Sequence, residues 1–294
     1  MAEQIIYIDG EYLPKSKAVI SVFDHGFLYG DGVFEGIRAY NGYVFKLKEH
    51  IDRLYESAKT MMLDVQMKKS VMGEAVIGTL KRNNLRDAYI RLIVTRGVGD
   101  LGLDPRKCPK SSVIVIAGTI SLMSKEAAEN GIKTLITWVR RDPIDGTSHE
   151  TKSLNYLNSI LAKIEANNVG ADEAIFLNPQ GYVCEGTAEN LFVIKNGNAL
   201  TPPTYTGALP GITQVAVIEI ASKMGIKVQS RPITAHELFN ADEVFFTGTA
   251  AEIIPVASIN GRVIGSGKAG EVTKKLRREF AKYAADPANG TPCV

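Results

Sequence analysis

The sequence predicts a two-domain protein of the α/β class, in which strands and helices alternate. With 294 residues, the chain is long enough for two ordinary domains with substantial cores. Strand and helix patterns alternate in the first third, and a second alternation opens with the apolar run Ile132–Val139. We therefore expect a small α/β domain over 1–120, a connection over 121–131 and a larger domain over 132–294.

The first strands are marked by turn residues. Ile5–Ile8 predicts a strand that enters a turn at Asp9 and Gly10. The runs 33–40 and 43–47 flank Asn41-Gly42, a pair that suits a type I′ turn, so they predict a hairpin.

A helix follows this hairpin, because Ile51, Leu54, Ala58 and Met61 recur at helical spacing. Two further β-branched runs predict strands over 88–95 and 112–117. Between them, the glycine-rich run 97–102 predicts a loop.

In the second domain, the segment after Gly211 predicts a helix with apolar residues on all sides. We expect this helix to be buried on more than one side. The run 274–282 predicts a basic terminal helix with a solvated face, and the tail from Asp286 should fray.

Composition excludes several classes of protein. Hydrophobic residues make up 45% and charged residues 22%, with a net charge of +2 and scattered basic residues. These values predict neither a nucleic-acid surface nor a basic membrane patch. The longest apolar stretch, near Val113–Ala117, is too short to span a bilayer. No signal peptide is evident, and the three cysteines form neither a disulfide framework nor a metal pattern, so we expect a cytoplasmic protein without a metal.

Four short runs carry the chemistry. Lys152–Tyr156 supplies an amine, 181–190 supplies a carboxylate, and 209–213 and 247–253 supply Gly/Thr turns that suit a phosphate. A cofactor with an aldehyde, a protonated pyridine ring and a phosphate needs all three. These runs therefore predict a site for pyridoxal 5′-phosphate (PLP).

In their order and spacing, these motifs resemble the fold-type IV PLP aminotransferases, and within them the branched-chain amino acid aminotransferases. The resemblance extends from Ile8 to about Phe280. It implies a small α/β domain and a larger pseudo-barrel domain that binds PLP. It also implies amino transfer from L-leucine, L-isoleucine or L-valine to 2-oxoglutarate, giving branched-chain 2-oxo acids and L-glutamate.

The resemblance assigns the Schiff-base lysine to Lys152, at the head of a helical segment. A lone lysine is usually a surface residue, but the flanking Ser-Leu-Asn-Tyr motif favours the catalytic role. Tyr156 shares a face with Lys152 if the segment is helical. In the family, a tyrosine here contacts the ring oxygen of the cofactor.

Glu185 matches the family carboxylate that keeps the pyridine nitrogen protonated. Glu189 lies four residues later, and we interpret it as a structural hydrogen-bonding residue, because the mechanism needs no second carboxylate.

For the phosphate, Gly211 opens a helix whose backbone N–H groups can bind an anion. Arg53 matches a phosphate-binding arginine of the family. Gln214 stands where the family often has arginine, and we assign it no role. The remaining predicted cofactor contacts are Leu209, Ile212, Thr213, Gly248 and Thr249.

The substrate site is predicted by the resemblance and by aromatic and basic side chains. In the family, residues equivalent to Tyr89 and Arg91 recognise substrate, and one equivalent to Tyr29 reaches in from a neighbouring subunit. For Phe34, Arg38 and Trp138, a role in packing or an ion pair is as good an interpretation; a role for Arg140 or Arg141 has less support. The turn Thr249, Ala250 and Ala251 would offer N–H groups to the substrate carboxylate.

Other activities use the same scaffold. D-amino acid transaminases generally have an apolar residue at the position of Tyr156, and aminodeoxychorismate lyase has a motif that Asp31–Glu35 does not match. An R-selective amine transaminase is a further alternative. A phosphate- or nucleotide-binding module without catalysis is disfavoured, because the G-x-G-x-x-G spacing at 97–102 precedes Pro105 instead of a helix. We interpret that run as a mobile loop over the active site.

The resemblance implies a homo-oligomer, a dimer or larger, whose active sites share residues between subunits. It leaves open the size of the oligomer and the preferred branched-chain substrate.

Overall fold

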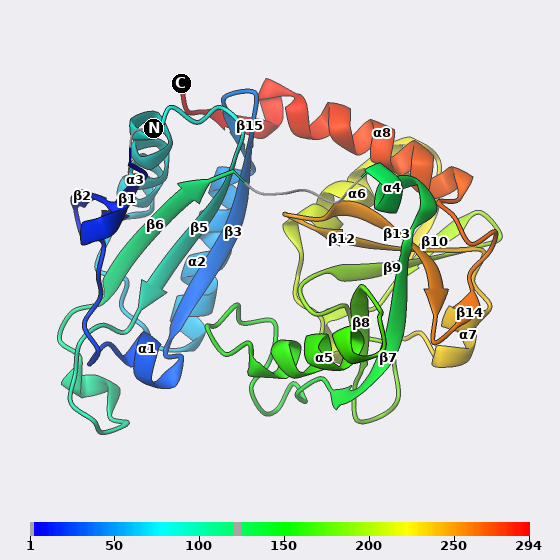
Figure 1. The fold of residues 1–294 in the computed structure, drawn as a ribbon, viewed down its shortest axis with the longest axis horizontal. Coiled ribbons are helices and arrows are strands. Elements are labelled where there is room, and N and C mark those ends of the chain that lie inside the picture. Colours follow the sequence, from blue (N-terminus) through cyan, green and yellow to red (C-terminus); the bar gives the residue numbers. More distant parts are fainter. Residues whose placement is uncertain (1–2, 120–124) are drawn as a thin grey trace. The chain divides into compact units, whose positions relative to one another are not determined.

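The computed structural model describes residues 3–119 and 125–294. By its internal contacts the chain divides into two compact units. The first contains Met1–Ser121, Thr151–Asn155 and Tyr283–Val294, and the second contains Leu122–Glu150 and Tyr156–Lys282 (Figure 1). Two segments that the sequence analysis assigned to the 132–294 domain, 151–155 and 283–294, therefore belong to the first unit.

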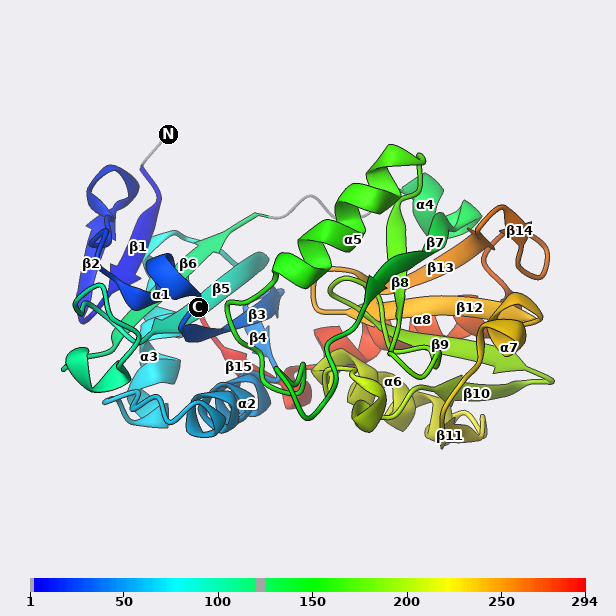
Figure 2. The same ribbon diagram turned by 90° about the horizontal axis from the view of Figure 1, so that it is seen from below.

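The first unit is built on a seven-stranded antiparallel sheet with the order β15-β4-β3-β5-β6-β1-β2 (Figures 1 and 2). Its predicted hairpin is confirmed: Asn41 and Gly42 have φ angles of 52° and 89°, as a type I′ turn requires. The strands are β1 (Ile5–Ile8), β2 (Glu11–Pro14), β3 (Gly32–Tyr40), β4 (Tyr43–Phe45), β5 (Ala88–Thr95), β6 (Ser112–Gly118) and β15 (Gly290–Pro292).

Helices α2 (Leu47–Thr60) and α3 (Lys69–Arg82) pack against this sheet, and the short α1 (His25–Tyr29) precedes β3. The apolar spacing that predicts α2 is confirmed, because Ile51, Leu54 and Ala58 are buried in the core. The 97–102 run has no helix or strand, as predicted.

The C-terminal tail does not fray, contrary to the prediction. Gly290–Pro292 pairs with β4 as an edge strand, and Cys293 is fully buried. Its backbone N–H donates to Gly42 O at 2.9 Å. Backbone pairing across the sheet edge thus orders a segment whose composition suggested disorder.

The second unit is built on a mixed sheet with the order β11-β10-β9-β12-β13-β7-β8, with β14 beside β13. The pairs β10–β11, β13–β7 and β7–β8 are parallel and the others are antiparallel. The strands are β7 (Ile132–Arg140), β8 (Glu173–Leu177), β9 (Asn190–Lys195), β10 (Asn198–Thr201), β11 (Val228–Ser230), β12 (Glu243–Gly248), β13 (Glu252–Ile259) and β14 (Arg262–Val263).

Of the predicted connection 121–131, residues 121–124 lie outside the described residues, and α4 (Lys125–Asn130) forms most of the rest. Helix α5 (Leu157–Asn168) lies along β7 and β8, as both views show (Figures 1 and 2). The other helices are α6 (Ile212–Lys223), α7 (Ala235–Phe239) and α8 (Glu271–Ala285).

Helix α6 has a wide buried face, but it is not enclosed on all sides. Thr213, Val217 and Ala221 are buried, whereas Val215 is 52% exposed. Helix α8 is basic and amphipathic, with Leu276 and Phe280 buried. In the part of the chain that the structure describes, no helix is long and apolar enough to cross a membrane.

Candidate active site

Lys152 lies in an extended segment that pairs with the start of β3. Its carbonyl oxygen accepts from Phe34 N at 3.0 Å, and its own N–H donates to Ser57 Oγ of α2 at 3.0 Å. The residue is 9% exposed, and Nζ lies 4.6 Å from the centre of the Phe34 ring. Burial and an aromatic neighbour separate Lys152 from an ordinary surface lysine.

The condition under which Lys152 and Tyr156 would share a helical face is not met. Residues 152–156 are not helical, because their backbone bonds to β3 compete with helix formation; α5 begins at Leu157. Tyr156 is the N-cap residue of α5 and belongs to the second unit, whereas Lys152 belongs to the first.

Arg53 lies on α2 in a buried charge network that the sequence analysis missed. Its Nε and Nη2 donate to the two carboxylate oxygens of Glu35 at 2.8 and 2.7 Å. His50 Nδ1 lies 2.7 Å from Glu35 Oε2. Burial alone would raise the pKa of Glu35, but Arg53 and His50 together lower it to about 2. Because the carboxylate is ionised, His50 Nδ1 carries the hydrogen and donates it.

Four predicted substrate residues lie side by side on the paired strands β3 and β5. Arg91 Nη2 donates to the Tyr89 hydroxyl at 3.0 Å, and the Arg91 guanidinium lies 4.5 Å from the Phe34 ring centre. Gly36 pairs with Arg91, and a β-carbon on Gly36 would lie 2.4 Å from the Tyr89 hydroxyl. Arg38 pairs with Tyr89 and is 6% exposed. Because glycine at 36 has no side chain, the Tyr89 hydroxyl can occupy the space above it on this face of the sheet.

Arg38 provides a buried cation with unused hydrogen-bonding capacity. Among the described residues, its Nε and Nη1 atoms have no hydrogen-bond partner, and its guanidinium lies 4.9 Å from the Tyr40 ring centre. A framework ion pair, one of the two interpretations of Arg38, is therefore absent from the described residues.

Tyr29 is at the end of α1 and is 37% exposed. Its hydroxyl donates to Leu101 O at 2.5 Å, and His25 Nε2 lies 2.8 Å from Asp100 O. Helix α1 thus holds the 97–102 loop.

In the second unit, Glu185 is buried and held at both carboxylate oxygens. Arg141 Nη2 donates to Oε1 at 2.9 Å, and Leu209 N donates to Oε2 at 2.9 Å. Asn190 Nδ2 lies 3.4 Å from Oε2. The predicted carboxylate thus adjoins the first residue of the predicted phosphate turn.

Asn190 joins the two predicted phosphate turns. Its Nδ2 donates to Leu209 O at 2.7 Å, and it pairs with Thr247 where β9 meets β12. Gly211, the N-cap residue of α6, packs against it: a β-carbon there would lie 1.8 Å from Asn190 Oδ1. The fold therefore requires glycine at 211 and brings both turns together through one side chain.

The first turn of α6 contains Ile212 and Thr213, as predicted. The first N–H groups of a helix lack intrahelical acceptors and favour an anion. Gln214, to which we assigned no role, donates from Nε2 to Thr201 Oγ1 at 2.8 Å in the interior. It is therefore a structural residue.

The second turn follows β12. Thr247 is fully buried, and among the described residues its Oγ1 has no hydrogen-bond partner. Gly248 ends the strand, and Thr249, Ala250 and Ala251 form the turn to β13.

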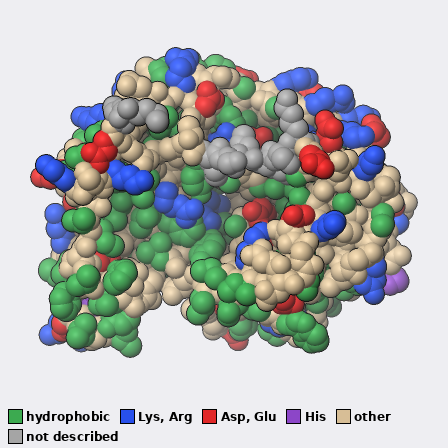
Figure 3. Space-filling model, viewed as in Figure 1, with side chains coloured by type: hydrophobic (Ala, Val, Ile, Leu, Met, Phe, Trp, Pro, Cys, Tyr) green, Lys and Arg blue, Asp and Glu red, His purple; other side chains and the backbone are tan. Residues whose placement is uncertain are grey.

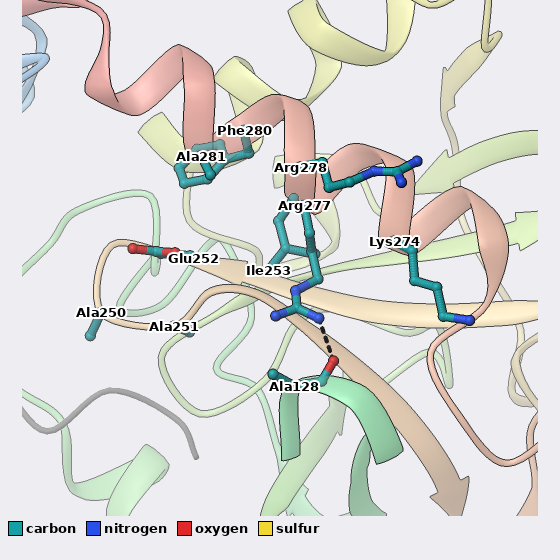
Figure 4. Close-up of a pocket in the computed structure, with 10 residues that line it drawn as sticks. All are labelled: Ala128, Ala250, Ala251, Glu252, Ile253, Lys274, Arg277, Arg278, Phe280 and Ala281. Atoms are coloured by element: carbon teal, nitrogen blue, oxygen red, sulfur yellow. Dashed lines mark hydrogen bonds between the residues drawn. The ribbon is translucent and has the colours of Figure 1, made fainter. Parts of the chain in front are cut away.

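Behind this turn lies a cavity of about 570 Å³ between β13, α4 and α8 (Figure 4). Ala250 and Ala251 line it, together with the basic side chains Lys274, Arg277 and Arg278. Figure 4 shows Arg277 directed towards Ala128, whose carbonyl oxygen accepts its hydrogen bond.

Of the other candidates, Trp138 is 85% exposed, which excludes a role in core packing. Arg140 is exposed and donates to Thr137 O at 2.8 Å. The sequence gives Arg141 little support and does not mark Asn190, Glu35 or His50 as site residues, although Asn190 ends the run 181–190. Only their partners in the fold distinguish these residues.

With this geometry, the chain belongs to the class IV aminotransferases: the model of the amino-transferase class IV family matches residues 32–259. The resemblance inferred from the sequence motifs is confirmed, and so is the fold-type IV class.

The chain is 56% identical over 275 residues to a putative branched-chain-amino-acid aminotransferase of Methanocaldococcus jannaschii, which covers 94% of each chain. It is 38% identical over 281 residues to the branched-chain-amino-acid aminotransferase of Escherichia coli K12, covering 94% of this chain and 91% of the relative. It is also similar to the crystal structure of the T.th. branched-chain amino acid aminotransferase complexed with N-(5′-phosphopyridoxyl)-L-glutamate. That match has a TM-score of 0.94 at 36% identity and covers 100% of both chains.

Proposed function

We propose that the protein is a PLP-dependent aminotransferase that acts on L-leucine, L-isoleucine and L-valine with 2-oxoglutarate. The products are the branched-chain 2-oxo acids and L-glutamate. The observation that carries this proposal is the buried Glu185 carboxylate, held by the backbone of the turn that opens α6. The names of the relatives support the substrate class, and the phosphopyridoxyl-glutamate complex of the T.th. enzyme supports the cofactor and the amino-group acceptor.

The residues present fit PLP. In the second unit, the first turn of α6 offers N–H groups and Thr247 offers a buried hydroxyl with no partner among the described residues. Glu185 offers a carboxylate for a protonated ring nitrogen. In the first unit, Lys152 offers a buried amine, and Arg53 is held in place by Glu35. The other proposed cofactor contacts are Tyr156, Leu209, Gly211, Ile212, Thr213, Gly248 and Thr249.

When bound, PLP supplies an aldehyde that takes up the amino group and a ring that withdraws electrons from the reacting carbon. Lys152 is the proposed attachment point, and its Nζ, freed when the substrate amine takes its place, would remove the α-proton of the substrate and hold it. Glu185 stabilises positive charge at the ring nitrogen.

We assign substrate recognition to the β3–β5 face. Phe34 offers apolar surface for a branched side chain, whereas Arg91 and Tyr89 offer donors for the side-chain carboxylate of glutamate. Arg38 is a further donor on this face. We further propose that Tyr29 acts in the site of a neighbouring subunit, and that the turn Thr249, Ala250 and Ala251 binds the substrate α-carboxylate.

We propose a homo-oligomer because each unit exposes apolar side chains in clusters (Figure 3). On α5 the exposed large apolar residues are Leu157, Ile160, Leu161 and Ile164, which follow one helical stripe. The first-unit apolar patch consists of Val19, Ile20, Val22, Phe23, Phe27, Val98, Leu101 and Leu103.

We also propose a cytoplasmic location, which the three free thiols Cys108, Cys184 and Cys293 suit. For the folding domains, we propose the division 1–120 and 132–294, except that the segments 151–155 and 283–294 belong to the first domain.

The first test is an absorption spectrum of the purified protein with PLP, before and after addition of L-leucine or D-alanine. We expect a visible band that L-leucine bleaches and D-alanine does not, with 4-methyl-2-oxopentanoate as the product. Bleaching by D-alanine alone would identify a D-amino acid transaminase, and bleaching by R-amines alone an amine transaminase. Pyruvate release from aminodeoxychorismate would identify the lyase.

Lys152→Ala should lack the visible band and turnover, while the exposed Lys133→Ala should retain both. A protein that shows no band in any variant would contradict the proposal as a whole.

A further inference from the structure

Arg141 is among the most buried side chains of the second unit, although nothing in the local sequence distinguishes it from Arg140. It follows β7 directly and is 1% exposed. Its guanidinium lies 3.8 Å from the Phe176 ring centre, and its backbone N–H donates to Leu177 O at 3.0 Å. Such burial of an arginine is unusual unless the charge is paired.

The guanidinium is held on two sides. Nη1 donates to Asn158 Oδ1 at 3.0 Å and to Ser159 Oγ at 3.3 Å, at the start of α5. Nη2 donates to Glu185 Oε1 and to Gly186 O, each at 2.9 Å. Arg141 thus connects the Glu185 carboxylate to the backbone of the next residue, Gly186, and to the start of α5.

Close packing fixes this arrangement further. Gly207 has a φ of 109°, and a β-carbon there would lie 2.8 Å from Arg141 Cγ. The chain therefore passes the arginine stem at a position where only glycine fits without strain.

A buried carboxylate without a cation takes up a proton, and a protonated Glu185 could no longer stabilise a positive ring nitrogen. An arginine keeps its charge at every working pH, so it cannot transfer a proton to the carboxylate. Lysine carries its three donors on a single nitrogen, so it cannot span Glu185 and the α5 residues as the two terminal nitrogens of Arg141 do.

We propose that Arg141 is a positioning residue that keeps Glu185 ionised and fixes its orientation towards the cofactor ring. The orientation of Glu185 towards the cofactor ring rests on the proposed function, because it assumes that the protein binds PLP. The coupling of Arg141 to Glu185 does not, and it can be tested in the cofactor-free protein.

The test is a double-mutant cycle in the full-length protein, with Arg141→Met, Glu185→Gln, the double variant, Arg141→Lys and Arg140→Met as the control. Two quantities are measured in each: the Tm of the cofactor-free protein at about pH 5.5 and pH 8.5, and the Kd for PLP. The Tm measurement does not depend on activity or on bound cofactor.

In Arg141→Met, the buried Glu185 loses the Arg141 guanidinium, and this loss favours its neutral form in the folded state, whereas the unfolded chain leaves the carboxyl ionised at high pH. We therefore expect its Tm, relative to the parent protein, to fall by about 3 °C or more between pH 5.5 and pH 8.5. Adding Glu185→Gln to Arg141→Met should remove this pH dependence, because glutamine does not titrate. The Kd for PLP should rise about tenfold in Arg141→Met but change less than about twofold when Arg141→Met is added to Glu185→Gln. Arg141→Lys should lie between the parent and Arg141→Met, and Arg140→Met should match the parent.

An equal fall in Tm at both pH values and in both backgrounds would make Arg141 a purely structural residue and overturn the proposal, as would additive effects on the Kd. If Arg141→Met does not fold, the same measurements on Arg141→Lys, alone and combined with Glu185→Gln, distinguish the coupling from a purely structural role. A parent protein that binds no PLP would contradict the proposed function instead, while the Tm cycle would still test the coupling.

Discussion

At the scale of single residues, Glu189 shows how the fold changes the chemistry of a side chain. It is half-buried, and burial together with the neighbouring Glu173 raises the pKa of its carboxyl to about 8. Its Oε2 accepts from Ala188 N at 3.1 Å, and its main-chain oxygen accepts from Gly186 N at 2.7 Å. The carboxyl lies near Gly248, where a β-carbon would approach Glu189 Cγ to 3.2 Å. Glu189 therefore supports the two turns that flank it, in line with a structural role.

Glu189→Gln should stabilise the protein increasingly as the pH rises. A carboxyl with a raised pKa in the folded state stays protonated while the unfolded chain ionises, so its contribution to stability is complete below about pH 4.5 and is lost towards pH 8. Glutamine carries no such cost. The difference in free energy of unfolding between variant and parent should grow between pH 5 and 8, at no more than about 1.4 kcal/mol per pH unit. Denaturant titrations at several pH values measure it; a difference that shrinks with pH would contradict the raised pKa.

At the scale of elements, the two faces of α2 carry charge pairs of different kinds. Glu35 and Arg53 are buried between β3 and α2, whereas Asp52, on the outer face, pairs with Lys48 at 2.7 Å and Lys69 at 2.6 Å. The lysine side chains of the outer pairs are 86% and 50% exposed. Solvent screens the outer pairs, so the inner pair should determine how firmly α2 is held.

Glu35→Gln should destabilise the protein by about 3–5 kcal/mol, because it leaves a buried guanidinium without its anion. The control Asp52→Asn should cost less than about 1 kcal/mol. Because Glu35 has a folded-state pKa of about 2, its contribution is present above about pH 4.5 and disappears towards pH 2, so the difference between parent and Glu35→Gln should narrow on acidification. Urea unfolding from pH 7 to pH 3 measures this. Equal costs for the two substitutions would contradict the assignment.

The C-terminal strand β15 is the second prediction at this scale. Deletion of 290–294 removes its pairing with β4 and the buried Cys293, and exposes the sheet edge. We expect Tm to fall by several degrees, about 2–4 °C for each kcal/mol lost. Deletion of Val294 alone, which is 61% exposed, should leave Tm unchanged. An unchanged Tm in the longer deletion would show that the tail adds nothing to the fold.

At the scale of the whole molecule, the apolar surface predicts association. The first-unit apolar patch includes Val22 and Phe27, which are 67% and 65% exposed. Phe27 and Tyr29 lie on the same short helix, so a subunit that covers the patch would also approach Tyr29.

Val22→Glu with Phe27→Glu should dissociate the oligomer, because charge on this patch opposes its burial. Met62→Glu, at a residue of the same unit that is 89% exposed, should leave the assembly intact. Light scattering coupled to gel filtration gives the mass of each variant. A parent protein with the mass of one chain would contradict the oligomer, and an unchanged mass in the double variant would place the interface elsewhere.

Local patterns in the sequence predicted the elements and the family. The Asn41-Gly42 turn and the apolar spacing of α2 each depend on interactions within a few residues, so a single segment contains the information. The motif runs likewise predicted the class IV membership, because each keeps its chemistry in a short stretch of chain.

Tertiary structure alone decided the partners of these motifs. Arg141 and Glu185 are separated by 44 positions, and Arg53 and Glu35 by 18, so no local spacing marks either pair. The non-helical backbone of Lys152 and the ordering of the tail as β15 have the same origin. Their backbone groups bond to strands that are distant in sequence, and the need to satisfy buried polar groups overrides the local preference.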